Sequence, residues 1–133
     1  MFDICILGKN CLLDAVIDEK LDVNIATAKG QRKMKIEFET RWPVEQAYTD
    51  SDGNNHIVSA ETTLRVYKRD SNVTFDEVMY LEVSGTSLRY QNVDLILGGN
   101  TAIARHIKRD GIPSYPLRLG EQSEGRQRSF LLY

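Results

Sequence analysis

The chain has 133 residues, of which 41% are hydrophobic and 27% charged, which suits one globular domain with a single core. Its net charge of −2 excludes the strongly basic surface by which proteins bind nucleic acids or anionic membranes non-specifically. Cys5 and Cys11 are too few for a disulfide framework and have no companions for a zinc site, so we expect a reducing compartment. No stretch approaches the roughly 20 apolar residues of a membrane span, and we expect no signal peptide.

The first two elements are a short apolar run and a predicted helix. Residues 2–7 are either a first strand or an arm that docks on a neighbouring chain. Residues 11–20 are predicted to be a helix, because Asn10 can cap it and apolar residues recur at helical spacing. These apolar positions are Leu12, Leu13, Val16, Ile17 and Leu21.

Strand-like alternation follows. Residues 22–28 are predicted to be a strand, residues 29–32 a polar turn, and residues 33–42 a second strand that ends at Trp42-Pro43. In the second strand Met34, Ile36 and Phe38 are expected to face the core, while the alternate positions are charged. A strand with one buried and one charged face is typical of an antiparallel sheet.

Residues 46–55 are predicted to form an exposed, projecting loop with Asx turns, because Asp, Asn, Ser and Gly are dense there. The stretch begins like a calcium loop, but its glycine is misplaced and its flanks are strand-like, which argues against calcium. We expect the side chains of this loop to contact another surface. The candidate interface residues are Tyr48, Asp50, Asp52 and His56, the last as a surface histidine without catalytic role.

The second half of the chain is expected to be built around a β-hairpin at residues 78–93. Strands are predicted at 57–58, 62–67 and 73–77, and the hairpin turns at residues 84–87 around Gly85. A bulge is expected at Gln91 and Asn92, where the alternation slips. After a turn at 98–100, residues 101–107 are predicted to be a final strand that carries a surface His106.

The last residues differ from the rest. Pro113 and Pro116 bracket an extended stretch, a polar segment follows, and residues 129–133 are apolar and aromatic. This is either an arm that wraps a neighbouring subunit or a frayed terminus. The candidate anchors of such an arm are Tyr115, Phe130, Leu131, Leu132 and Tyr133.

No arrangement of residues points to catalysis. The sequence lacks a phosphate-binding glycine loop, a nucleophile elbow and a pair of histidines at metal spacing. We therefore predict no catalytic, cofactor-binding or metal-binding residues, and no enzyme activity. Aromatic and basic residues do mix at 67–69 and 89–90, as in OB-type barrels that bind single strands. Residues 1–62, however, hold 11 acidic and 7 basic side chains, and this net negative charge argues against that function.

These elements predict a mainly β fold, a small antiparallel β-sandwich or barrel with one short N-terminal helix and an extended C-terminal tail. The predicted domain covers residues 1–109, and residues 110–133 form the arm.

The order of elements over roughly residues 10–108 resembles that of head–tail connector proteins of tailed bacteriophages, the head-closure or stopper type. Their motif, G-D-x-v-x-v-x-G-x-x-Y-x-V-x-x-V, is matched here by Asp76, Gly85 and Val93. Leu88 stands where Tyr is usual and Tyr90 where Val is usual, and Phe75-Asp76 replaces the Gly-Asp pair.

The resemblance implies a structural virion protein, made in the host cytoplasm, that forms a ring in the phage neck. Such a ring joins the portal and head to the tail and helps to retain DNA. The loop at 48–57 would then face the channel or the next ring, and residues 112–133 would dock on a neighbour. The implied partners are further copies of the chain, portal or adaptor proteins, tail proteins and packaged DNA, with no membrane. Alternatives are a tail-terminator or baseplate adaptor protein and an OB-like nucleic-acid-binding module.

Overall fold

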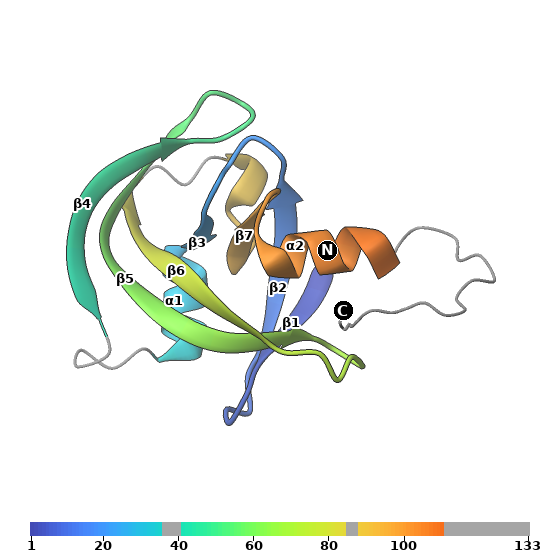
Figure 1. Ribbon diagram of the computed structural model, residues 1–133. Coiled ribbons are helices and arrows are strands. Elements are labelled where there is room, and N and C mark those ends of the chain that lie inside the picture. Colours follow the sequence, from blue (N-terminus) through green and yellow to red (C-terminus); the bar gives the residue numbers. More distant parts are fainter. Residues whose placement is uncertain (36–40, 85–87, 111–133) are drawn as a thin grey trace.

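The computed structural model describes residues 1–35, 41–84 and 88–110, and the fold within them is mainly β (Figure 1). Seven strands, two helices and one 3-10 turn follow each other along the chain. In chain order they are β1 (Phe2–Ile6), β2 (Leu12–Asp18), β3 (Asn24–Ala26), α1 (Ala28–Met34), β4 (Trp42–Thr49), β5 (Asn55–Lys68), β6 (Phe75–Ser84), η2 (Leu88–Tyr90), β7 (Leu95–Gly98) and α2 (Ala102–Asp110).

The strands form one curved, mixed sheet in the order β1-β2-β7-β3-β6-β5-β4. Strand β1 also pairs with the far end of the long strand β5, so β1 has a partner on each side. Two pairs, β2–β7 and β3–β6, are parallel. The prediction of an antiparallel sheet is therefore wrong, and the fold is neither a clear sandwich nor a clear barrel.

The predicted helix at 11–20 is strand β2. Leu13 and Ala15 are fully buried, and β2 lies between β1 on one side and β7 on the other. Leu13 and Ala15 pack on one face of the sheet and Val16 packs on the other, so both faces of β2 are covered and its sequence loses the alternation that marks a half-exposed strand. The apolar run then fits a helical period equally well.

The predicted strand at 33–42 is also wrong. Its first residues end helix α1, residues 36–40 lie outside the described part of the chain, and Trp42 begins β4 instead of ending a strand. The predicted turn at 29–32 lies within α1. The helix forms because Thr27 caps it, accepting a hydrogen bond from the Gly30 N–H, and because Lys35 adopts the left-handed conformation that ends it.

The central hairpin does not form as predicted. Strand β6 is present, but β7 pairs with β2 and β3, and β3 separates it from β6. The turn at 84–87 lies almost wholly outside the described residues, and Gln91 and Asn92 form a turn after η2 in place of a bulge. Residues 101–107 lie in the loop before α2 and in α2 itself, not in a strand, and the helix starts where Glu77 accepts the Ile103 N–H.

Several predictions are confirmed. Residues 2–7 contain strand β1, residues 22–28 contain β3, and a turn occurs at 98–100. The strands predicted at 57–58 and 62–67 belong to the single strand β5. The arm at 110–133, with Tyr115 and the four terminal anchors, lies outside the described residues except for Asp110, the last residue of α2.

Two apolar clusters hold the fold together. The larger is lined by the sheet strands, α1 and α2, with Met34 and Ile103 contributed by the helices. The smaller lies on the other side of β3 and β7 and contains Leu21, Ile25, Tyr90, Val93 and Ile96. Of the described residues, neither helix has the length and apolar composition needed to cross a bilayer.

Candidate functional site

Strands β4 and β5 form a hairpin whose tip, residues 50–54, reaches over the end of β2 and η2 (Figure 1). The predicted Asx turn is confirmed, because the Asp50 carboxylate accepts hydrogen bonds from the N–H groups of Asp52 (2.9 Å) and Asn54 (3.0 Å). Gly53 has a φ of 85°, which a tight reversal of this kind requires. The tip is thus a locally ordered turn.

His56 is completely buried, contrary to the prediction of a surface histidine. Its Nε2 lies 2.7 Å from Asp50 Oδ2, and its Nδ1 contacts Glu82 Oε2 of β6. The register between β5 and β6 shifts on both sides of Val58, which brings Glu82 inward beside Leu81. The hydrogen bond to Glu82, and then that to Asp50, raises the pKa of His56 although burial opposes this. Because each ring nitrogen faces a carboxylate oxygen, which can only accept a hydrogen bond when ionised, these contacts favour the imidazolium form, with a proton on both nitrogens.

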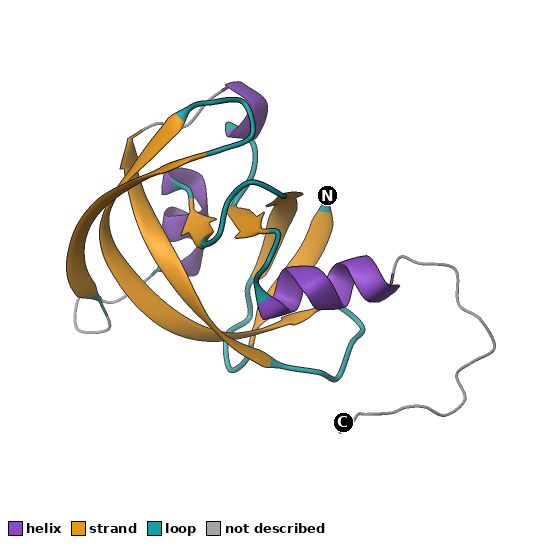
Figure 2. Ribbon diagram, turned by 45° about the horizontal axis from the view of Figure 1, so that its top comes forward, coloured by secondary structure: helices purple, strands orange, loops and turns teal. Residues whose placement is uncertain are grey.

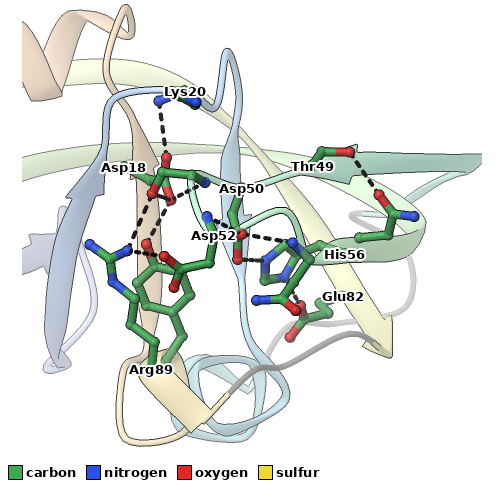
Figure 3. Close-up of polar contacts among 12 residues, drawn as sticks. Asp18, Lys20, Thr49, Asp50, Asp52, His56, Glu82 and Arg89 are labelled. Atoms are coloured by element: carbon green, nitrogen blue, oxygen red, sulfur yellow. Dashed lines mark hydrogen bonds and ion pairs between the residues drawn. The ribbon is translucent and has the colours of Figure 1, made fainter.

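Asp18 ends β2 and is 1% exposed. Its Oδ2 accepts hydrogen bonds from the Tyr90 hydroxyl (2.6 Å) and from the backbone N–H (3.0 Å) and hydroxyl (2.9 Å) of Ser51, while Oδ1 accepts from the Lys20 N–H (3.0 Å) (Figure 3). Burial alone would raise the pKa of Asp18, but these hydrogen bonds outweigh it and lower that pKa. Asp18 is therefore an ionised carboxylate in the interior whose charge is stabilised by hydrogen bonds from the protein.

Arg89 fastens the tip from outside. Its guanidinium donates to Asp52 Oδ1 (2.8 Å) and to the Ser51 hydroxyl (3.3 Å), and it lies over the Tyr90 ring. The buried members of this arrangement come from β2, β6, η2, the hairpin tip and the start of β5. We call Asp18, Asp50, Ser51, His56, Glu82 and Tyr90 the tip cluster.

No protein-family model and no curated protein matches this chain.

The tip cluster has side chains suited to acid–base chemistry, but these side chains hydrogen-bond to one another. Asp18 and His56 make these hydrogen bonds within the fold, and two surface pockets of the described residues lie elsewhere, around the β5–β6 turn. In the described part of the chain no group of three or more His, Cys, Asp and Glu side chains is placed to hold a metal ion. The arrangement fixes the position of the β4–β5 hairpin.

The predicted interface residues of the loop divide into two kinds. Asp50 and His56 point inward, so they are not available as projecting contacts. Asp52 is partly exposed and pairs with Arg89, and Tyr48 is half-buried against the Tyr80 ring, 5.2 Å away between centroids. Burial, with Tyr80 and Glu61 nearby, raises the pKa of Tyr48 to about 12.

Sequence reasoning missed Asp18, Glu82 and Tyr90. The signal that could have found the two acids is their position, since Asp18 follows Val16-Ile17 and Glu82 stands between Leu81 and Val83. An acidic residue in an apolar β run is costly to bury unless it has partners. Nothing in the sequence indicated that these partners are His56 and Tyr90.

A second feature is strand β4 itself, which lies at the end of the sheet order and pairs only with β5 among the described residues. Trp42 is 68% exposed, and its cross-strand neighbours Glu61 and Tyr80 are directly paired in one row, so the three share a face of the sheet. Val78 extends this face, two residues from Tyr80. We call Trp42, Tyr48, Val78 and Tyr80, with the free edge of β4, the β4 surface.

The stability of the protein is expected to be greatest between about pH 4 and pH 6.5. The pKa of His56 is raised above its ordinary 6.5, so its contribution is complete below 6.5 and is lost as the pH rises through the higher folded pKa. The pKa values of Asp50 and Asp18 are lowered below 3.8, so their contributions are present above 3.8 and are lost as the pH falls through the lower folded values. Urea unfolding midpoints from about pH 3 to pH 9 measure this profile.

The matched variant for this profile is His56→Gln, which has no group that titrates in the alkaline range. We expect it to lose the decline in stability above pH 6.5 while keeping the acid limb from Asp18. An unchanged alkaline limb in the variant would contradict the assignment to His56.

Proposed function

We propose that this chain is a structural protein that associates with further copies of itself through the β4 surface. The observation that carries the proposal is the exposure of β4. Six of its eight residues are exposed, and the strand begins with the largest exposed aromatic side chain of the described residues, Trp42. Tryptophan is enriched at the energetic centres of protein interfaces, and Trp42 lies on the same face as Tyr80 and the exposed Val78, an apolar patch of the kind that marks interaction sites.

The tip cluster supports this role by holding the hairpin in place. Among the described residues strand β4 pairs only with β5, so its position depends on what fixes the hairpin. Asp18, Ser51 and Tyr90 tie the tip to β2 and η2, and His56 ties β5 to Glu82. A preorganised surface loses less conformational entropy on association than a mobile one.

The setting that we propose is the neck ring of a tailed phage particle, with portal and tail proteins as further partners and no catalytic role. The structure differs from the order of elements behind that resemblance at 11–20, 78–97 and 101–107. The self-association proposal therefore depends on the β4 surface, and the phage neck remains a prediction of where such an assembly acts.

The test is the oligomeric state of the full chain. We expect sedimentation velocity to show concentration-dependent association that Trp42→Lys weakens by more than about tenfold, with an unchanged unfolding midpoint. Val73→Lys is the matched control, since Val73 is 43% exposed but lies in the turn between β5 and β6, beyond the part of β5 that pairs with β4. A wild-type chain that stays monomeric up to high concentration would refute the proposal.

A second candidate function is acid–base hydrolysis, and the observation that favours it is Asp18. An ionised carboxylate at the end of a strand, covered by a hairpin tip, could activate water if the tip opened. One carboxylate cannot be acid and base at once, whereas two that share a proton can. A second copy across a two-fold axis would supply the other Asp18.

In that reaction, which is hydrolysis of a peptide bond, water gives a proton to one carboxylate and its oxygen adds to the carbonyl carbon of that bond. The carbon–nitrogen bond then breaks as the leaving amine takes a proton from the other. The measurement is cleavage of an unstructured protein substrate such as casein at about pH 4 to 7, with Asp18→Asn as the inactive control. Equal cleavage by the variant, or none by either protein, would rule this candidate out.

A further inference from the structure

We infer that residues 129–133 of a second copy add to the free edge of β4 as an extra strand. This inference deepens the proposed function, since it names the segment that the β4 surface accepts. It depends on the geometry of the edge, the composition of the segment and the separation of the two within one molecule.

The acceptor is an open strand edge of suitable length. From Gln46 to Thr49, β4 pairs residue by residue with β5, opposite Val58 to Asn55, so this part is regular. Its other edge has no strand partner among the described residues. Pro43, which cannot donate to a ladder, and the irregularity that follows it confine the regular edge to the end nearest the tip. About four or five residues can therefore be accommodated.

The segment has the composition of an added strand. Residues 129–133 read Ser-Phe-Leu-Leu-Tyr, and aromatic and apolar residues favour strands that gain one buried face. They match the regular edge in length. Phe130 or Tyr133 beside Tyr48 would extend the aromatic contact that Tyr48 already makes with Tyr80.

Charge also matches between the two. Arg126 and Arg128 precede the apolar residues, and β4 carries an exposed Glu45, with Glu61 in the neighbouring strand. Opposite charges at the rim of an interface help to set the orientation of the partner more than its affinity. Glu45 and Glu61 therefore favour this segment over the acidic stretches elsewhere in the chain.

The donor is a second copy because of where the described chain ends. Helix α2 ends on the opposite side of the body from β4, in both Figure 1 and Figure 2. Docking on the same molecule would have to fix residues 111–128 across the whole body, and each residue so ordered loses conformational entropy. If a second copy lies with its β4 beside α2 of the first, residues 111–128 of the first copy do not have to cross the body to reach it. The contact is head-to-tail, so it propagates from copy to copy and closes into a ring only if the rotation allows.

The test compares a donor variant and an edge variant of the full chain. Leu131→Asp places a charge in the donor segment. Gln46→Pro and Ala47→Pro are made as a pair, because successive N–H groups of a strand point to opposite edges, so one of them removes only a free-edge donor. The member of this pair that keeps the wild-type unfolding midpoint is the edge variant.

We expect each variant alone to associate at least about tenfold more weakly than the wild-type chain, and their mixture to form a 1:1 complex that grows no further. Only the donor segment of the edge variant and the β4 edge of the Leu131→Asp variant then remain intact. If both variants associate as the wild type does, strand addition is wrong while the proposed function stands. A monomeric wild type refutes both.

Discussion

Replacing His56 by alanine is expected to lower the free energy of unfolding by about 3–5 kcal/mol. The substitution removes the imidazolium that lies between the carboxylates of Asp50 and Glu82, both of which are buried. Each would then keep a negative charge away from water or take up a proton, and either costs stability. Urea unfolding at pH 6, followed by circular dichroism, measures the loss.

The control for His56→Ala is Arg65→Ala. Arg65 makes a two-contact ion pair with Asp76, but both side chains are more than half exposed, so its removal should leave the free energy of unfolding almost unchanged. A loss below about 1 kcal/mol for His56→Ala would mean that water replaces the imidazole without cost, and the tip cluster would then not hold the hairpin.

Replacing Gly30 by alanine is expected to destabilise the protein by more than about 3 kcal/mol, although alanine is the better helix former by about 1 kcal/mol. An added Cβ would lie 2.1 Å from the backbone oxygen of Asp94, and backbone cannot swing aside as a side chain can. The segment at Asp94 is held to α1 by the Thr27 N–H and by Lys29 and Lys33, so the helix cannot move away freely.

Gly8→Ala is the matched control for this effect. Gly8 lies in a turn rather than a helix, with a φ of 85° and nothing within 4 Å of the added Cβ, so its cost is the left-handed conformation alone, about 1–2 kcal/mol. The free energy of unfolding should therefore fall further in Gly30→Ala than in Gly8→Ala. A smaller loss for Gly30→Ala than for Gly8→Ala would contradict the close packing of α1 against Asp94.

The strands that could be predicted from the sequence are those with one exposed face. In β5 the residues alternate between the core and solvent from His56 onward, so the period of two is visible. In β2 both faces are covered, because Leu13 and Ala15 pack on one side of the sheet and Val16 on the other, so that signal is lost. In α2 the buried positions Ile103, Ala104 and Ile107 do follow a helical spacing, but a run this short also fits a strand.

The candidate site could be predicted only in part, because it is assembled from four separate segments. The hairpin tip was recognisable from its Asp, Asn and Gly residues, and so was its Asx turn. That His56 turns inward depends on Glu82, 26 residues away, and on the register shifts that aim it. Pairing across such a distance leaves no local pattern in the chain.

The sheet order has a consequence for synthesis. Strand β7, at residues 95–98, lies between β2 and β3, which are made some 70 residues earlier. While the nascent chain leaves the ribosome, the inner edges of β2 and β3 stay open until that late strand arrives, and open edges invite pairing with other chains. Folding should therefore complete only after translation has passed β7, and the protein's yield in the cell should respond to chaperones that shield unfinished sheets.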